Sequence, residues 1–343
     1  MELDILTVKS IIILLVFGIS LGIATYSTWA ERRLAAYLQD RQGPNRAGPL
    51  GLLQPIADAV KLFTKEEFIP ASANKWLFIF GPSLAMLTAL MSSAVIPFGS
   101  TLEIGDKFIP VQGIEVNIGV LYSFGIVSLG VYGIMIGGWA SNNKFSLLGA
   151  VRAASQNISY ELAMGLAIVA VLMMSGSLDL RKIVEDQHGG NWNVFYQPLG
   201  FIIFLTCAFA ECNRTPFDLP ESENELVGGY HTEYSSMKLG LFLFSEYVNM
   251  FVASAIVSVL YFGGYNYPGM DLVADHVPHN LATAIGIAVM FAKTFFFIFF
   301  FMWIRWTIPR FRYDQLMSLG WKSLIPLAIA NIIVTGCVIL LFN

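Results

Sequence analysis

The fold of this chain is decided by two apolar runs, residues 195–212 and 238–262, with the sequences FYQPLGFIIFLTCAFAEC and KLGLFLFSEYVNMFVASAIVSVLYF. Each is close to the roughly 20 residues that a helix needs to cross a hydrocarbon core about 30 Å thick. The connection between them is acidic. Together with the end of the first run it holds one quarter of the chain's 24 acids, namely Glu211, Asp218, Glu221, Glu223, Glu225 and Glu233.

The composition of the whole chain is that of a polytopic membrane protein. Of its 343 residues, 56% are hydrophobic and 13% are charged, whereas a soluble domain has about 25% charged residues. Twenty basic residues against 24 acidic ones give no basic face for nucleic acid. The three cysteines form no C-x-x-C pair, so we expect no disulfide framework and no iron–sulfur cluster. His276 and His279, three residues apart in a connection, favour a solvated loop over a metal site.

Eight apolar runs are long enough to cross a membrane. They lie at residues 10–30, 76–97, 117–140, 157–175, 195–212, 238–262, 283–304 and 321–342. If the runs alternate in direction, four connections share one side of the membrane: 31–75, 141–156, 213–237 and 305–320. With their flanks they hold fifteen of the 20 lysines and arginines, and the opposite side holds four.

The positive-inside rule places these four connections in the cytoplasm or matrix and both termini outside. No linker or change of composition divides the chain. The sequence therefore predicts an all-α polytopic membrane protein with eight transmembrane helices, forming a single membrane domain over residues 1–343.

The first of these connections contains a predicted amphipathic helix on the cytoplasmic side. From Leu50 to Glu66, apolar residues recur every three or four positions, and Gln54, Asp58 and Lys61 fall on the opposite face. This pattern is typical of a helix that lies on the membrane surface. Such a helix is either an interfacial anchor or a wall of the entrance for a lipid-soluble substrate.

Three ionisable residues are predicted inside the spans. Glu161 lies near the start of the fourth run, Glu246 about a third of the way into the sixth, and Lys293 near the middle of the seventh. Because an ionised side chain at a helix centre costs about 2.5–3.5 kcal/mol on the insertion scale, we expect all three to face the bundle interior. They are either a Glu–Lys pair that sets helix register or a proton relay, since burial and a neighbouring charge make protonation switchable.

Glu31 and Glu211 end the first and fifth runs, at membrane depth beside the predicted cytoplasmic connections. Like charges as close as those of the acidic connection repel one another. That connection is therefore either a solvated face or an arrangement that takes up and passes protons. Together with the acids inside the spans, it forms a line of carboxylates that leads into the membrane.

Two glycine pairs have the spacing of close helix contacts. Gly18 and Gly22, and likewise Gly133 and Gly137, are four residues apart within predicted spans. Small residues at this spacing allow two helix backbones to approach each other. We therefore expect both pairs to lie at helix–helix contacts.

Several polar motifs, in order from about residue 25 to 325, give the chain a close resemblance to one family. They are Glu31-Arg-Arg33, Arg41-Gln-Gly-Pro-Asn-Arg46, residues 53–65, Gly138-Trp-Ala-Ser-Asn142, Ser155-Gln-Asn-Ile-Ser-Tyr-Glu161, Ala210-Glu-Cys-Asn-Arg-Thr-Pro-Phe-Asp218, Glu233-Tyr-Ser-Ser-Met-Lys238 and Arg310-Phe-Arg-Tyr-Asp-Gln315. In these motifs the chain resembles the H-type subunits of bacterial NADH:quinone oxidoreductase, the family of mitochondrial NADH dehydrogenase subunit 1. The eight-span topology of that family agrees with the eight apolar runs.

The resemblance implies a membrane subunit of respiratory complex I, a translocase, with no catalytic residue within this chain alone. In such proteins the first span, the amphipathic helix and the sixth span frame the tunnel by which ubiquinone or menaquinone enters. The positions that match the tunnel wall and its polar mouth are Glu31, Arg32, Arg41, Arg46, Asp58 and Lys61. The positions that match carboxylates proposed to couple quinone reduction to proton movement, with the buried lysine, are Glu161, Glu211, Asp218, Glu221, Glu223, Glu225, Glu233, Glu246 and Lys293.

The resemblance also implies the cofactors, partners and membrane. The chain itself is expected to bind no cofactor and no metal, quinone being its substrate, while FMN and the iron–sulfur clusters belong to partner subunits. Those partners are the iron–sulfur and 49-kDa-type subunits of the quinone site, small membrane subunits and antiporter-like subunits. The membrane is the bacterial cytoplasmic membrane or the mitochondrial inner membrane.

Two other functions use the same kind of scaffold. A free-standing ion transporter could also use Glu161, Glu246 and Lys293, but the long structured connection 31–75 favours a docked partner. The membrane subunit of an energy-converting hydrogenase would have less need of a quinone tunnel. The match of residues 31–65 therefore favours the quinone enzyme.

Overall fold

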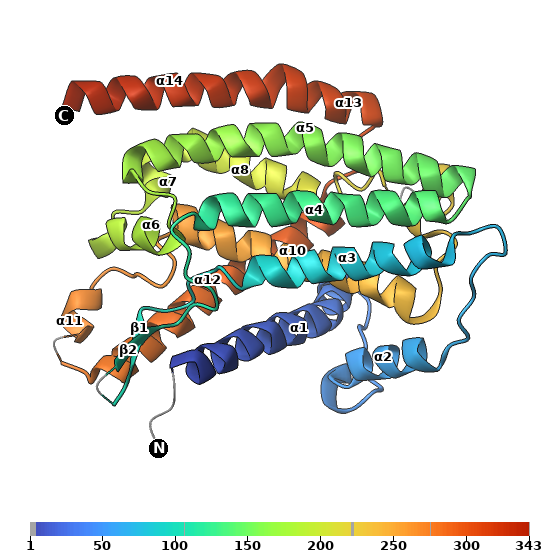
Figure 1. Cartoon of the computed structure of the whole chain (residues 1–343), viewed down its shortest axis with the longest axis horizontal. Coiled ribbons are helices and arrows are strands. Elements are labelled where there is room, and N and C mark those ends of the chain that lie inside the picture. The colour runs from blue at the N-terminus through green and yellow to red at the C-terminus, as the bar shows by residue number, and fades with distance from the viewer. Residues whose placement is uncertain (1–4, 106, 221–222, 275, 343) are drawn as a thin grey trace.

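The computed structural model describes residues 5–105, 107–220, 223–274 and 276–342, without the side chains of residues 5, 6, 104, 223, 224, 271, 274 and 342. Most of it is helical (Figure 1). The first elements are α1 (Ile5–Leu38), η1 (Pro49–Gly51), α2 (Gln54–Thr64), α3 (Lys75–Ser93), β1 (Thr101–Ile104), β2 (Lys107–Pro110), α4 (Gly119–Ala140), α5 (Lys144–Ser175), α6 (Leu180–Asp186) and η2 (His188–Gly190). They are followed by α7 (Asn193–Tyr196), α8 (Pro198–Glu211), α9 (Glu223–Leu226), η3 (Gly229–His231), α10 (Ser236–Tyr261), α11 (Met270–Ala274), α12 (His279–Thr307), α13 (Tyr313–Ser318), the π-helical turn η4 (Leu319–Leu324) and α14 (Ile325–Phe342).

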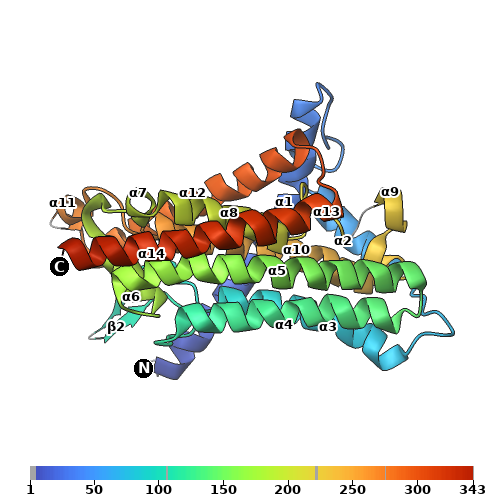
Figure 2. The ribbon, with the colours of Figure 1, turned by 90° about the horizontal axis from the view of Figure 1, so that it is seen from above.

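The bundle is built around α10. The most apolar stretch of α10 is 72% buried, against 22–44% for the other long helices. It packs against α1, α3, α8 and α12, while α3, α4, α5 and α14 follow one another, each against the next. Seen from above, α14 lies beside α5, and α12 is inclined to the other helices (Figure 2).

The two ends of the bundle differ in their connecting elements. We call the end where α1 stops and α2 lies the α2 end, and it also holds residues 213–220 and 223–235 (Figure 1). The opposite end, which we call the hairpin end, carries α6, α7, α11 and the antiparallel pair β1–β2, in which Thr101 lies opposite Pro110. Chain segments therefore cross the whole length of the bundle between the two ends.

Seven helices are long and apolar enough to cross a membrane, within the described part of the chain, and up to eight if one bent pair counts as a span. The chain is therefore an all-α protein of the multi-pass membrane class. The bent pair, residues 188–196 and 198–211, turns by 75°. It corresponds to the fifth predicted span, 195–212, which the sequence alone presented as a continuous run.

The break before α8 has a local cause. Pro198 begins α8, and Gln197 before it has non-helical dihedral angles, because the residue before a proline is driven out of the helical region. The helix ends at Glu211 and has only 14 residues. Its length of about 21 Å is less than the roughly 30 Å of a hydrocarbon core.

Two predicted connections are largely helical in the structure. Residues 141–156 were expected to form a loop, but α5 begins at Lys144 and runs for 32 residues, with the Asn143 side chain accepting a hydrogen bond from the Phe145 N–H. Similarly, α1 continues to Leu38, so Glu31 lies within a helix and not at its end. Hydropathy marks where apolar residues stop, whereas a helix needs only its backbone hydrogen bonds to continue.

The glycine pair in α4 makes the expected close contact. A Cβ on Gly133 would lie 2.8 Å from the Ala85 backbone nitrogen of α3, and one on Gly81 would lie 2.8 Å from the Gly137 Cα. Backbone thus meets backbone between α3 and α4. The pair in α1 differs, since a Cβ on Gly18 or Gly22 would meet nothing within 4 Å. For α1 the predicted contact is absent within the described chain.

Candidate functional site

Two consecutive residues near the end of α1 point to different surroundings. Glu31 is 4% exposed and faces the inside of the bundle, whereas Arg32 is exposed and faces α2. Because successive residues of a helix are about 100° apart around its axis, one short stretch of α1 serves two separate polar clusters.

The inner cluster is a buried ion-pair triad. The Arg214 guanidinium donates to Glu31 at 2.6 Å, and Arg305 lies 2.6 Å from the other oxygen of the same carboxylate. Arg214 also stacks on the Tyr247 ring, 4.1 Å from its centroid. Burial opposes the charge on Arg214, but Glu31 beside it raises the pKa of that guanidinium above its usual value. Arg214 therefore stays charged at the start of the acidic connection.

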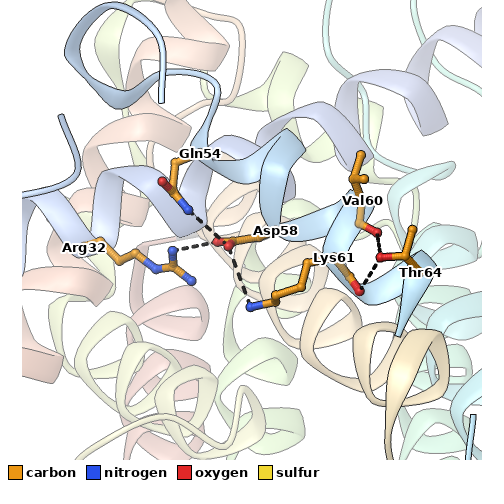
Figure 3. A network of polar contacts seen from close by, with 6 residues as sticks. All are labelled: Arg32, Gln54, Asp58, Val60, Lys61 and Thr64. Atoms are coloured by element: carbon orange, nitrogen blue, oxygen red, sulfur yellow. Dashed lines mark hydrogen bonds and ion pairs between the residues drawn. The ribbon is translucent and has the colours of Figure 1, made fainter. Parts of the chain in front are cut away.

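The outer cluster surrounds Asp58 of α2. Arg32 donates to one Asp58 oxygen at 2.6 Å, and Gln54 donates to the other at 3.2 Å, which also lies 3.8 Å from the Lys61 ammonium (Figure 3). One turn further on, the Thr64 hydroxyl donates to the Val60 and Lys61 carbonyls. Three side chains thus hold one carboxylate, and two of them are cationic.

A cavity of about 160 Å³ opens beside this cluster, between α1, α2 and α10. Arg32 and Asp58 line it together with apolar side chains, which are Pro55, Ala59, Leu62, Leu243 and Phe244. Tyr247, the ring beneath Arg214, is also in its wall. The cavity is therefore apolar along α10 and charged at α1 and α2.

Arg41 and Arg46 lie elsewhere. Both are exposed in the turn between α1 and α2, and Arg41 donates to Gln39 at 2.8 Å. The turn is held to α1 by Trp29 and Arg33, which both donate to the Leu50 carbonyl at 3.2 Å. Among the described contacts, neither Arg41 nor Arg46 reaches Asp58.

Glu211 and Glu246 share a second, enclosed cavity of about 30 Å³. Glu246 accepts a hydrogen bond from the Tyr230 hydroxyl at 2.8 Å. A neighbouring apolar cavity of about 40 Å³ shares Glu211 and Asn249 with it. Since a cavity holds a water molecule at about 10–15 Å³, the two together have room for a few waters between these carboxylates.

Glu161 lies in the middle of α5 and not near its start, because the helix begins at Lys144 and not at the predicted residue 157. It accepts a hydrogen bond from the Ser128 hydroxyl of α4. It borders an open groove of about 580 Å³ between α4, α5 and the helix that contains Trp321. Trp321 donates from Nε1 to Ser159 at 3.1 Å, so the π-helical turn η4 is tied to α5 two residues before Glu161.

The described acids of the connection between α8 and α10 are paired individually. Asp218 accepts from Arg310 at 2.6 Å, Glu225 from Arg152 at 2.5 Å, and Glu233 from the Asn143 amide at 2.6 Å. Glu221 and the Glu223 side chain lie outside the described residues. Each described acid of the connection therefore has its own donor, and its predicted role in taking up and passing protons stays a prediction.

Lys293 pairs with no glutamate among the residues that the structure describes. Its ammonium donates to the backbone carbonyls of Phe262, Gly264 and Asn266 at 2.7, 2.8 and 2.6 Å. The Glu–Lys pair considered from the sequence is thus not formed. At the hairpin end, His279 contacts Thr101 through Nε2, and the described residues contain no group of three metal-ligating side chains.

Comparison with known proteins assigns the chain to a family. The family model described as NADH dehydrogenase matches residues 10–336. The chain belongs to this family. Its resemblance to the H-type subunits, found in the polar motifs, is confirmed by three bacterial relatives, each named as an H subunit of NADH-quinone oxidoreductase. The one from Flavobacterium johnsoniae is 65% identical over 340 residues, 99% of this chain and 97% of that protein. The one from Cytophaga hutchinsonii is 64% identical over 334 residues, 97% of each chain, and one from Geobacter metallireducens is 49% identical over 329 residues, 96% and 95%.

The structure of this member of the NADH dehydrogenase family adds residues that sequence reasoning did not select. Arg214 and Arg305 complete the triad with Glu31, and Tyr230 donates to Glu246. Arg214 carried a signal, because it is the one cation among the acids of its connection. Tyr230 carried none, since a tyrosine between two glycines and a histidine has no pattern that indicates a buried acceptor.

Proposed function

We propose that this chain is the membrane subunit of a proton-translocating NADH:quinone oxidoreductase, respiratory complex I, in which it frames the quinone tunnel and couples quinone reduction to proton translocation. The family and the names of its relatives support the first part. One observation carries the proposed coupling role. Arg32 of α1 reaches the cavity beside α2, while Glu31, the residue before it, binds Arg214 at the start of the acidic connection.

The cavity between α1, α2 and α10 suits part of a quinone. Leu62, Leu243 and Phe244 offer apolar surface to a ring or an isoprenoid tail, and Arg32 offers a donor to a carbonyl oxygen. Lys61 lies behind this wall, 3.8 Å from Asp58. Its volume of about 160 Å³ is smaller than the 300–1,000 Å³ of a typical ligand site. The remaining wall is therefore supplied by partners, the iron–sulfur and 49-kDa-type subunits, which Arg41 and Arg46 contact from the exposed turn between α1 and α2.

Coupling follows from the pairing of charges. Reduction of the quinone to quinol takes two electrons from an iron–sulfur cluster of a partner subunit and two protons from nearby groups, and the loss of those protons changes the charge beside Asp58 and Arg32. Because buried charges interact more strongly than solvated ones, the change acts on Glu31 and Arg214, and through them on the cavity of Glu211 and Glu246. The protonation state of these two acids then acts on Glu161. Across the groove beside Glu161, it acts on the small membrane subunits and the antiporter-like subunits.

The topology is part of the same proposal. The bent pair α7–α8 counts as one span, so that eight spans alternate and the α2 end lies in the cytoplasm or matrix with both termini outside. Exposed apolar side chains on α2, which are Ile56, Val60 and Phe63, support a position on the membrane surface as an amphipathic helix. The whole chain is one membrane domain, in the bacterial cytoplasmic or mitochondrial inner membrane, with FMN and iron–sulfur clusters in partner subunits.

Two substitutions test the coupling role. Glu246→Gln and Glu161→Gln remove one proton-carrying group each and keep the shape of the side chain. We expect NADH:quinone turnover and coupled proton translocation to fall by roughly 100-fold, at the lower end of what one proton-transfer group contributes. NADH oxidation by a hydrophilic artificial acceptor, which does not need this chain, should be unchanged.

The matched control is Glu185→Gln, because Glu185 is half exposed and pairs with Arg181 at the hairpin end. It should leave both activities at the wild-type level. Equal loss of both activities in the Glu246 variant would indicate failed assembly and contradict the coupling role. A chain that moves ions without partners, or a complex that evolves hydrogen and ignores quinone, would contradict the proposed enzyme.

A further inference from the structure

The half-buried Lys293 has contacts that the coupling proposal does not use. All three protons of an ammonium group can be donated, and here three carbonyls, of Phe262, Gly264 and Asn266, lie at 2.6–2.8 Å from Nζ. The Trp192 ring covers the group at 4.9 Å from its centroid. This arrangement holds the ammonium between α12 and the segment that follows α10.

The carbonyls at the end of α10 are also occupied. Gln187 donates to the Val259 carbonyl at 2.9 Å and Asn193 to the Leu260 carbonyl at 2.8 Å. The Ser258 carbonyl accepts from the Gly264 N–H at 2.8 Å. The last four carbonyls of a helix have no partner within it and usually bind water. Here side chains of other elements take that place.

The packing around this helix end is closed. Val257, Val259, Leu260 and Tyr261 are 0% exposed, as is Ile183 of α6. The four residues of α10 follow directly after Ile256, which lines the apolar cavity next to Glu211. A water molecule needs both room and two to four polar partners. Beyond Ile256 the cavity ends in fully buried side chains and in carbonyls that already have donors.

We propose that Lys293, Gln187 and Asn193 form a proton-tight seal between the cavities of Glu211 and the hairpin end. The seal works because it replaces water at the end of α10 with fixed donors from Gln187 directly after α6, from α7 and from α12. Lys293 is then a positioning residue for the sealed segment, not a relay group. Protons that reach Glu211 and Glu246 do not leave the chain at the hairpin end.

The test is a leak measurement on the assembled complex in proteoliposomes. Lys293→Met keeps the length of the side chain but leaves three carbonyls without donors. With the quinone reaction inhibited and a potassium diffusion potential imposed, we expect passive proton conductance to rise several-fold, while uncoupled NADH:quinone turnover stays within about twofold of wild type. Lys293→Arg, which keeps donors, should restore low conductance.

Two further variants make the result decisive. Lys9→Met removes an exposed lysine that pairs with Glu115 outside the sealed segment and should leave the conductance unchanged. If Lys293→Met prevents assembly, Asn193→Leu removes one donor from the same helix end and should raise the conductance in its place. Wild-type conductance in an assembled Lys293→Met or Asn193→Leu complex overturns the seal. The measurement needs no turnover, so a failure of the proposed quinone function would leave its outcome unaffected.

Discussion

The two ends of the bundle satisfy their buried polar groups in different ways. Toward the α2 end, a buried carboxylate is held by cationic side chains, since Glu31 accepts from Arg214 and Arg305 at 2.6 Å each. At the hairpin end, the partners are backbone groups: the Gln187 amide donates to Val259 and accepts from Asn193 and Gly263, and the Lys293 ammonium donates to three carbonyls. The ion pairs described there, such as Arg181–Glu185, are partly exposed to the outside.

This difference indicates which end can change state. A carboxylate can gain a proton and an ion pair can separate, so the groups near the α2 end have two states each. An amide bound to a carbonyl has one state at any pH near neutrality. The bundle therefore combines a region near the α2 end, where protonation can change the charge, with a region at the hairpin end, where the hydrogen bonds of the buried amides do not change with pH.

The largest expected effect comes from removing a buried charge. Arg214→Met leaves Glu31 with Arg305 alone, and breaking a buried pair by removing one partner costs about 3–5 kcal/mol. We expect the thermal unfolding midpoint of the purified complex to fall sharply, and quinone turnover to be lost before NADH oxidation by an artificial acceptor. The control is Arg181→Met, since a surface pair is worth about 0–1 kcal/mol. Equal stability of the two variants would show that the inner ion pairs are no more important than surface ones.

A smaller effect is expected from an amide at the hairpin end. Gln187→Leu keeps most of the volume but leaves the Val259 carbonyl and the N–H groups of Asn193 and Gly263 without this partner. An orphaned buried group costs about 1–3 kcal/mol. We expect a lower unfolding midpoint with quinone turnover preserved in the complex that assembles. A specific loss of turnover at unchanged stability would break the distinction between the two ends.

The smallest effect on stability is expected where the ion pair is exposed. Arg32→Gln removes the 2.6 Å contact with Asp58, but the arginine side chain is 52% exposed. Such a pair contributes about 0.2–1 kcal/mol, so the unfolding midpoint should barely move. Because Arg32 lines the cavity beside α2, we expect the KM for quinone to rise instead. An unchanged KM would remove Arg32 from the proposed quinone site.

Much of the fold could be predicted, because hydropathy and spacing are local properties. The apolar runs correspond to the long helices, and the Gly133–Gly137 pair lies where α3 and α4 touch. The break at Pro198 was missed, because the apolar run is continuous in composition although its backbone is not. The start of α5 at Lys144 was also missed, since polar residues within a helix look the same as a connection in a hydropathy profile.

The sequence indicates which charged residues belong to the candidate site, but it does not indicate which partners they bind. Glu161, Glu246 and Lys293 stood out because ions within apolar runs are costly. Their partners come from distant parts of the chain: Ser128 of α4, Tyr230 of η3, and the carbonyls after α10. Such pairs depend on how the helices are placed against one another, which a single sequence does not state. Arg32 and Asp58 could be linked more directly, because both lie on motif positions of one connection.

The triad around Glu31 also sets an order for the making of the protein. Arg214 is 183 residues further along the chain than Glu31, and Arg305 comes later still. At about 5–20 residues per second, a ribosome needs roughly 10–40 s to make the first interval. During that time α1 has been made, but the two arginines that bind the Glu31 carboxylate have not yet been synthesised. The end of α1 can therefore reach its final position only after α12 has been made, so the docking of this helix end is among the last steps of folding.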